Sequence, residues 1–380
     1  MTKDYSRDFG PFEDTVWLNC AHQGPLPHVA VTEAQEAIAW KIAPYKMTTE
    51  RFNQVPQNLK HALGKLIEAP SEDVILGNSA SYGLHLLANG IAWKTGDEVL
   101  LVEGDFPSDI LPWLGLRNKG VNVRLLKPRQ YVIQPDELLR NITSSTRLFC
   151  TTLVHSFSGF VADAQALGEI CRSKEILLVL NVSQALGARR FTVSDASADA
   201  IVGVGFKWLC GPYGTGFCWI NPQLRESLQY NQAYWLAMQT ADDLVKEQSI
   251  PALRDDLGAR RYDVFGTANF FNFKPLAASV EYLLAQGIEN IEAHDQKLIT
   301  RLIQGLDTKK YDLLSPRDEA GRSTLVFISH KEPARNGEVY EKLRKEKVFA
   351  AYRAGKLRFS PHLYNTEADI DRALSVLNSA

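Results

Sequence analysis

The sequence predicts an α/β protein, with a mainly parallel seven-stranded sheet in a large domain and a smaller α+β domain at the C-terminus. Between about residues 70 and 220, short apolar runs alternate with amphipathic segments, which is the pattern of βαβ units. After about residue 255 this alternation stops and long helical stretches predominate. We therefore place the large domain at residues 15–255 and the small domain at residues 256–380, with segment 1–14 packing near the small domain.

Seven apolar runs are predicted to form the strands of the large sheet. They are DVIL (73–76), EVLLVE (98–103), NVRLL (122–126), RLFCTTLV (147–154), EILLVL (175–180), AIVGVGF (200–206) and GFCWI (216–220). Helices are predicted between them over residues 81–93 and 162–174, where the segments are amphipathic.

The C-terminal region is predicted to begin with one long helical stretch over residues 276–306. A strand over 324–330, a helix near 337–346 and a closing helix over 367–379 follow it. The polar loop at 315–323, SPRDEAGRS, is expected to be exposed. This order indicates an α+β domain after an α/β domain.

Composition excludes several classes of function. The 380 residues include 42 basic and 44 acidic side chains, a net charge of −2, and no long run of one sign. Nucleic acids and anionic membranes are therefore not expected as partners. No apolar stretch approaches the length of a membrane span, and the charged N-terminus lacks the core of a signal peptide.

The five cysteines are odd in number and show no CxxC spacing. Neither a disulfide framework nor a zinc site is indicated, so we expect no bound metal. Most of the cysteines stand among apolar residues and are expected to be small core residues. A reducing cytoplasm is the expected location.

Lys207 is the most informative single residue, because it follows an apolar run and precedes a tryptophan and several glycines, in GVGFKWLCGPYGTGF (203–217). A lysine with its ordinary pKa of about 10.4 is a poor nucleophile near neutral pH. Burial and neighbouring groups can lower the pKa to about 7–8, where the amine can attack a carbonyl. A surface lysine ahead of a loop is the alternative at this point.

Other unusual residues also follow predicted strands, where ligands bind in open parallel sheets. GNSAS (77–81) leads directly into a helix, whose N-terminus would suit a phosphate. The remaining strand ends are followed by GDFPSD (104–109), HSFSGF (155–160), NVSQALG (181–187) and Lys207. Each signal is weak alone, but all of them fall on the same edge of one sheet.

Taken together, these motifs resemble the class V aminotransferase family of pyridoxal phosphate (PLP) enzymes of fold type I. That family includes cysteine desulfurases, kynureninase and isopenicillin-epimerase-like proteins. The resemblance extends from LNCAHQGPLP (18–27) to LRFSPHLYNTEADID (357–371). It implies that Lys207 forms a Schiff base with PLP.

The resemblance also implies which residues hold the cofactor. The phosphate would bind the helix start, Phe106 would stack on the pyridine ring, and Gln184 would contact the phenolic oxygen with Ser156 nearby. Thr267, in RYDVFGTANF (261–270), resembles a residue that reaches the phosphate of the partner subunit, which implies a homodimer. The full implied set is Ser79, Ala80, Ser81, Phe106, Ser156, Asn181, Gln184, Lys207 and Thr267.

For the substrate, Arg358 resembles the arginine that clamps a carboxylate, a task suited to its planar fork. Arg353 is a rival for that role, and His22 is a further candidate for substrate contact. The alternative for Arg358 is an arginine paired with a carboxylate on the domain surface.

Two departures from the family pattern matter. The family's desulfurases carry a cysteine shortly before the last arginine motif, whereas VFAAYRAGKLRFS (348–360) has none, so persulfide chemistry is not expected. Asn181 stands where nearly all fold-type-I enzymes place an aspartate that keeps the pyridine nitrogen protonated. An uncharged amide should weaken the ring as an electron sink.

The predicted function is that of a PLP enzyme acting on an amino acid, with transamination as the default and no cysteine desulfurase activity. A lyase that cleaves a C–S bond or, like kynureninase, a C–C bond is an alternative, favoured slightly by FPSD, and an epimerase is another. A second alternative is a PLP-binding protein with weak or no turnover, because of Asn181.

Overall fold

The computed structural model describes all residues except 1–3, 230–232, 240–244, 246–252 and 320. Its large sheet contains the seven predicted strands in the spatial order β2-β8-β7-β6-β5-β3-β4. The strands are β2 (Val74–Gly77), β3 (Glu98–Val102), β4 (Asn122–Leu126), β5 (Thr146–Thr152), β6 (Leu177–Asn181), β7 (Ala200–Val204) and β8 (Gly216–Ile220). Only β8 runs antiparallel to its neighbours, β2 and β7, so the prediction of a mainly parallel sheet is confirmed.

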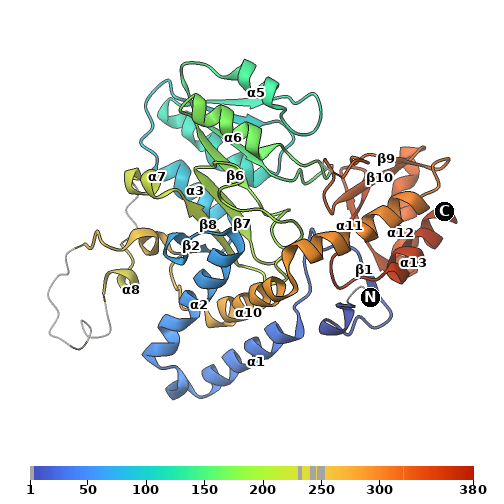
Figure 1. The fold of residues 1–380 in the computed structure, drawn as a ribbon, viewed down its shortest axis with the longest axis horizontal. Coiled ribbons are helices and arrows are strands. Elements are labelled where there is room, and N and C mark those ends of the chain that lie inside the picture. The colour runs from blue at the N-terminus through green and yellow to red at the C-terminus, as the bar shows by residue number, and fades with distance from the viewer. Residues whose placement is uncertain (1–3, 230–232, 240–244, 246–252, 320) are drawn as a thin grey trace.

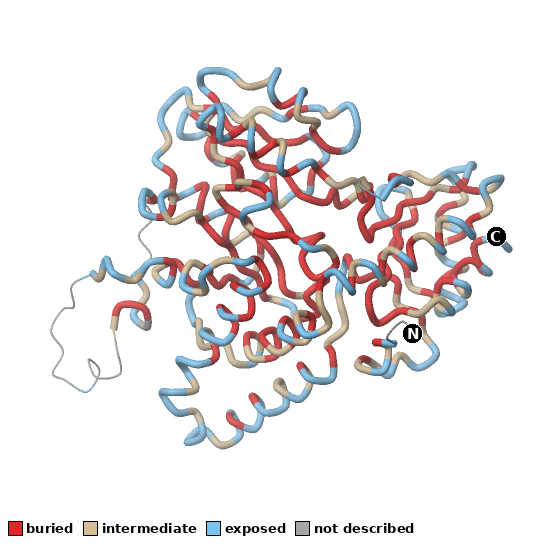
Figure 2. The backbone as a smooth tube through the Cα atoms, in the orientation of Figure 1, coloured by how far each residue is buried: buried red, intermediate tan, exposed pale blue. Residues whose placement is uncertain are grey.

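The strands are apolar throughout because both faces of the sheet are covered. Successive side chains in a strand point to opposite faces. On one face Leu76, Phe149 and Leu178 therefore join the core formed by α2 (Thr49–Ile67), α6 (Ala164–Ser173) and α10 (Phe270–Gln286). On the other face Ile75 and Val179 pack against α3 (Ala80–Gly90) and α4 (Leu111–Leu114). Figure 2 shows these strands as the buried centre of the molecule.

The C-terminal unit is smaller and contains an antiparallel sheet in the order β12-β13-β10-β9. Its strands are β9 (Tyr311–Leu313), β10 (Val326–His330), β12 (Ala351–Arg353) and β13 (Lys356–Phe359). Three helices share its core, α11 (Ile288–Gly305), α12 (Asn336–Lys345) and α13 (Glu367–Asn378). The N-terminal strand β1 (Val16–Trp17) pairs with β11 (Val348–Phe349), so the start of the chain lies beside this unit (Figure 1).

Four further helices complete the described chain outside these two sheets. They are α1 (His28–Ile42), α5 (Pro135–Asn141), α7 (Pro222–Ser227) and α8 (Trp235–Met238). Nowhere in the described residues is a helix both long enough and apolar enough to cross a bilayer.

The long helical stretch predicted over 276–306 is wrong in one respect, since it is two helices, α10 and α11. Gly287 separates them with φ +83°, a left-handed conformation that glycine adopts without steric strain. Helix α10 packs against α1 and α2, whereas α11 packs against α13 in the C-terminal unit. The domain boundary between residues 255 and 256 stays a prediction.

The polar loop at 315–323 is only partly exposed, contrary to the expectation. Its two ends are buried because their hydroxyl groups bind carbonyl oxygens of the turn after β5. Ser315 Oγ donates to the carbonyl of Ser158 at 2.6 Å, and Ser323 Oγ donates to that of Gly159 at 2.7 Å. Arg322 is 4% exposed and donates to Gln296 on α11. The loop therefore connects the small unit to the large sheet.

Candidate active site

A cavity of about 530 Å³ lies at the edge of the large sheet where its parallel strands end. Five strands, β2, β3, β5, β6 and β7, deliver residues to it from their carboxyl ends, as expected for ligand sites in open α/β sheets. Strand β8 runs the opposite way and begins at this edge, so Tyr213, just before β8, also lines the cavity.

The cavity gathers nearly all the residues predicted from the sequence. Those that line it are His22, Ser79, Ala80, Ser81, Phe106, Ser156, Asn181, Gln184, Lys207, Arg353 and Arg358. Thr267 does not line it, and lies instead in a separate groove with Phe52 and Lys60.

Lys207 is half-buried and lies near the start of the loop that follows β7. Burial, and next the positive charge of Arg358, lower the pKa of its amine to about 8. The Nζ atom lies 5.5 Å from the ring centroid of Phe106 and 6.0 Å from that of Phe206. The amine therefore has a substantial neutral fraction near neutral pH, as attack on a carbonyl requires.

The backbone of Lys207 is held by the N-terminal segment. The amide of Gly24 donates to the carbonyl of Phe206 at 3.0 Å. A Cβ atom on residue 24 would lie 2.0 Å from the carbonyl oxygen of Lys207, so only glycine permits this approach. Residues far apart in the sequence thus define the position of the lysine.

The start of α3 forms one end of the cavity. Ser79 is the N-cap, and its Oγ accepts a hydrogen bond from the amide of Tyr82 at 3.3 Å. The first amides of a helix have no intrahelical acceptor and carry a partial positive charge. Together with the hydroxyl of Ser81, they can bind a phosphate group.

Two buried amide side chains, Asn181 and Gln184, follow β6. Asn181 Oδ1 accepts from the amide of Ser183 at 2.9 Å, and its Nδ2 donates to Asp109 Oδ1 at 2.7 Å. Gln184 Oε1 accepts from Trp208 Nε1 at 2.9 Å, and its Nε2 donates to the carbonyl of Ala21 at 3.2 Å. Each amide orientation is therefore determined by a backbone or indole partner.

Phe106 also lines the cavity, and 40% of the residue is exposed. Its ring is stacked near Phe157, with centroids 6.2 Å apart and planes 19° apart. A flat aromatic ligand can extend such a stack, because offset parallel rings are a favoured arrangement.

Arg358 is the buried cation of the cavity, with 5% of its surface exposed. Strand β13 holds it between β10 and β12, and its guanidinium donates to Asn19 Oδ1 at 3.0 Å. Its Nε has no hydrogen-bond partner in the described chain. Burial, and next Arg353, lower the pKa of Arg358 to about 10. A desolvated guanidinium with a free N–H is suited to bind a carboxylate.

Arg353 and His22 line the same cavity but are exposed. The pKa of His22 is lowered, first by burial and then by the charges of Arg353 and Arg358. The predicted substrate end of the site is therefore a region of positive potential.

A buried polar cluster lies behind Lys207. His362 Nδ1 contacts Asp295 Oδ2 at 2.6 Å, and its Nε2 contacts the carbonyl of Trp208 at 3.1 Å. Burial alone would lower the pKa of His362, but the charge of Asp295 outweighs it and raises the pKa to about 10. The thiols of Cys20 and Cys210 lie nearby. Because both ring nitrogens face acceptors, both carry protons and neither is available as a metal ligand.

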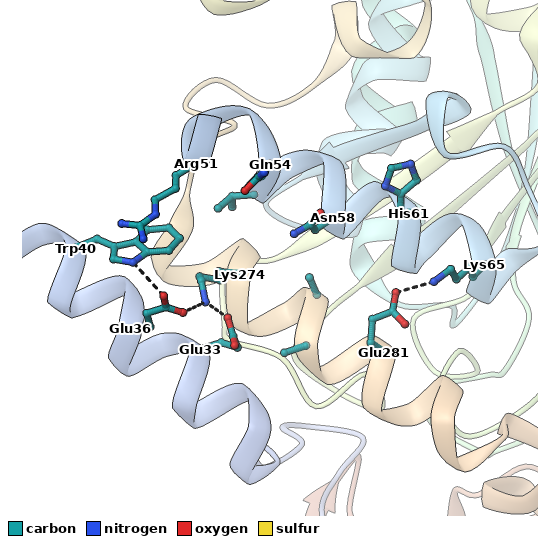
Figure 3. Close-up of a pocket in the computed structure, with 13 residues that line it drawn as sticks. Glu33, Glu36, Trp40, Arg51, Gln54, Asn58, His61, Lys65, Lys274 and Glu281 are labelled. Atoms are coloured by element: carbon teal, nitrogen blue, oxygen red, sulfur yellow. Dashed lines mark hydrogen bonds and ion pairs between the residues drawn. The ribbon is translucent and has the colours of Figure 1, made fainter. Parts of the chain in front are cut away.

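A second cavity, of about 710 Å³, lies between α1, α2 and α10 (Figure 3). Most of its charges are paired. Lys274 forms ion pairs with Glu33 and Glu36, and Lys65 contacts Glu281 at 3.1 Å. The cavity at the sheet edge instead contains Lys207, Arg353 and Arg358 and no carboxylate among the described residues that line it, which makes it the stronger candidate for binding an anionic ligand.

Sequence reasoning missed several residues of the site, notably Asp109, Asn19 and Tyr213. Asp109 stands in the same FPSD motif as Phe106, and Asn19 stands in the N-terminal motif. Neither position carried a signal, because their contacts are with residues distant in the sequence. Asp109 meets Asn181, and Asn19 meets Arg358.

A family model for aminotransferase class-V matches residues 43–373. The chain belongs to the class V aminotransferase family. This membership confirms the predicted resemblance and the predicted cofactor, PLP. The donor set agrees with that cofactor: an amine for an aldehyde, a helix N-terminus for a phosphate, and amides for the ring substituents.

Named relatives cover most of the chain at low identity. A probable cysteine desulfurase of Methanothermobacter thermautotrophicus is 26% identical over 79% of this chain and 74% of its own length. Isopenicillin N epimerase of Streptomyces clavuligerus is 25% identical over 95% of this chain and 94% of its own. The solved structure of the cystine C–S lyase C-DES with cysteine persulfide aligns with a TM-score of 0.86 and 19% identity, over 96% of this chain and 97% of that one. Such structural neighbours confirm fold type I for this family member.

Proposed function

We propose that this protein is a PLP-dependent enzyme that acts on an α-amino acid with a free carboxylate, and that transamination is its reaction. One observation carries the proposal. A single cavity contains an amine whose pKa is lowered to about 8 and a buried guanidinium whose Nε is unpartnered in the described chain. The first group suits covalent attachment of an aldehyde cofactor, and the second suits a substrate carboxylate.

In this proposal Lys207 holds the cofactor and then moves the substrate α-proton as acid and base. The start of α3 and Ser81 bind the phosphate, and Phe106 covers one face of the ring. Gln184 and Ser156 bind the phenolic oxygen, and Arg358 orients the substrate. PLP, when bound, supplies an electron sink for the charge left at the substrate α-carbon.

A lyase or an epimerase is the alternative, because these reactions share the first proton transfer. This alternative is supported by two relatives, one described as a probable cysteine desulfurase and the other as isopenicillin N epimerase. A desulfurase that forms a persulfide on its own cysteine is disfavoured here. All five cysteines are at most 1% exposed, and none lines the cavity.

The test combines cofactor trapping with a panel of amino acids. The protein reconstituted with PLP is reduced with borohydride and digested, and we expect the label on Lys207. Lys207→Ala should remove it, whereas Lys356→Ala, a nearby lysine that contacts Tyr131, should not. Label on another lysine, or none, would reject the assignment.

The panel then identifies the reaction. Each amino acid is supplied with and without a 2-oxo acid acceptor. Formation of a new amino acid from the acceptor supports transamination. Release of sulfide, pyruvate or alanine without an acceptor would show that the enzyme is a lyase. Inversion at the α-carbon would show that it is an epimerase. Either result would reject transamination.

A PLP-binding protein with weak turnover is the second alternative. It is considered only because Asn181 stands where an aspartate is expected. Turnover of any panel substrate at the rate usual for enzymes, on the order of 10 per second, would exclude it.

We further propose that the protein is a homodimer and that Thr267 completes the partner's site. Thr267 lies outside its own cavity, in a groove lined by Phe52 and Lys60. Several large apolar side chains near this groove are exposed, which is typical of an interface. They include Phe52, Phe265 and Phe271.

A further inference from the structure

Asp109 is a buried carboxyl group that no role described so far uses. It ends the 3-10 helix Pro107–Asp109, directly after Phe106, and is 1% exposed. Its Oδ1 accepts from Asn181 Nδ2 at 2.7 Å, and its Oδ2 has no hydrogen-bond partner in the described chain. Buried polar atoms are nearly always satisfied, so this oxygen needs an explanation.

The nearby Asp105 provides an internal comparison. It too is buried, but its carboxylate accepts hydrogen bonds from the amides of Phe106 and Thr152 and from the Thr151 hydroxyl. Asp109 has only the amide of Asn181. Burial, and next the charge of Asp105, raise the pKa of Asp109 well above its usual range. The charge of Lys207 favours the ionised form of Asp109, but it does not offset these two effects, and no cation forms an ion pair with Asp109 in the described chain.

Asn181 connects this carboxyl group to the cavity. The amide of Ser183 donates to Asn181 Oδ1, which fixes the side chain with Nδ2 toward Asp109. Oδ1 still has one unused lone pair, and Asn181 lines the cavity. The amide of Asn181 thus lies between the carboxyl group of Asp109 and the cavity.

We propose that Asp109 is a positioning residue that supplies, through Asn181, the negative charge for the ring-nitrogen end of the cofactor site. This inference rests on the proposed function and on the position at Asn181 that the family resemblance implies for the ring nitrogen of PLP. The Asp109 carboxylate, which accepts from Nδ2, polarises the amide so that electron density shifts toward Oδ1, and Asn181 Oδ1 becomes a stronger acceptor for a protonated ring nitrogen. Hydrogen bonds in such chains strengthen one another in a low-dielectric interior.

The proposal explains why an uncharged residue is acceptable at position 181. The carboxylate has not been lost from this end of the site, but lies one hydrogen bond further away. A protonated ring nitrogen would add a second positive charge to that of Lys207 near Asp109, so the ring charge and the carboxylate charge favour each other.

It also changes what Asn181→Asp can test. That substitution would place two carboxyl groups 2.7 Å apart, if the contact with Asp109 is kept. Two carboxyls at that distance share one proton instead of both being ionised. The informative variants are therefore Asp109→Asn and the exchange Asp109→Asn with Asn181→Asp.

Asp109→Asn removes the charge and keeps the hydrogen bond, because the new Oδ1 can still accept from Asn181 Nδ2. The readout is nitrogen-15 NMR of PLP labelled at the ring nitrogen and bound to the protein, which reports the protonation of that nitrogen without any substrate. We expect a protonated nitrogen in the natural protein and loss of that proton in Asp109→Asn. PLP affinity should fall about tenfold, the equivalent of one pKa unit.

Two controls separate the inference from a general effect of charge or folding. Asp105→Asn should leave the nitrogen protonated, and the exchange variant should restore the proton. The inference is overturned if the natural protein holds an unprotonated nitrogen, if Asp109→Asn leaves the signal unchanged, or if Asp105→Asn has the same effect. If PLP binds normally and any of those results is found, this inference alone is overturned. If PLP does not bind, the proposed function is overturned as well.

Discussion

Lys207 is activated by its surroundings, because desolvation and the charge of Arg358 both favour the neutral amine. Asp109 and Cys20 favour the protonated form, but their effect on the pKa of Lys207 is smaller. The same burial that makes the amine reactive makes its reactivity dependent on pH.

The first prediction concerns that dependence. The rate at which the protein without cofactor captures PLP should rise with pH through about 8, because the neutral amine is the reactive form. Arg358→Gln removes a nearby positive charge, so it should raise the pKa of Lys207 and move the midpoint to higher pH. The visible band of bound PLP after rapid mixing measures the rate. Arg117→Gln, an exposed arginine outside the cavity, should leave the midpoint in place.

Arg358 and Arg353 differ in burial, which leads to a second prediction. Arg358→Lys keeps the charge but loses the planar fork, so affinity for the amino-acid substrate should fall by about a hundredfold, equivalent to roughly 2–3 kcal/mol. PLP affinity should not change. Equilibrium titration of the PLP spectrum with substrate measures both. Arg353→Lys should have a much smaller effect, because exposed contacts contribute less; the reverse result would assign the clamp to Arg353.

At the level of elements, helix α11 is connected to the loop of Lys207 by one buried ion pair. Asp295 on α11 contacts His362, which follows β13, and His362 contacts the carbonyl of Trp208. All three residues are fully buried or nearly so. The small unit thus touches Trp208, the residue next to Lys207.

The third prediction is that His362→Gln lowers the free energy of unfolding by about 3–5 kcal/mol near neutral pH, because Asp295 would lose its charged partner. Urea denaturation measures this, and the double variant with Asp295→Asn should recover part of the loss.

The pKa of His362 is raised from 6.5 to about 10 in the folded protein. The stabilisation should therefore be complete below about pH 6.5 and disappear as the pH rises toward 10. A natural protein whose stability does not fall over that range would contradict the ion pair.

At the scale of the whole molecule, the proposed dimer gives a fourth prediction. Phe271, in the first turn of α10, is 43% exposed and lies four residues after Thr267. Phe271→Asp should shift the protein toward monomer in sedimentation velocity and weaken PLP binding, because Thr267 would no longer reach the partner's phosphate. An aspartate is compatible with a helix start, so folding should be preserved. Leu139→Asp on α5, at the other end of the molecule from α1 in Figure 1, is the control and should stay dimeric. A natural protein that is monomeric with PLP fully bound would reject the dimer.

Much of this architecture was predictable, because strands and helices leave local periodic patterns of apolar residues. All seven strands of the large sheet lie close to their predicted ranges. The site residues that directly follow those strands were predictable too, since parallel strands end on one edge. The family model matches residues 43–373, a range that includes these motifs.

What the tertiary structure alone decided are contacts between residues far apart in the chain. Asn181 meets Asp109 across 72 positions, and Arg358 meets Asn19 across 339. Local sequence carries no record of such pairs, because they depend on how sheets and helices pack. The sequence by itself determined a PLP-family fold and most of the side chains at one sheet edge. Only the packing decided that a buried carboxyl group, that of Asp109, lies directly behind Asn181.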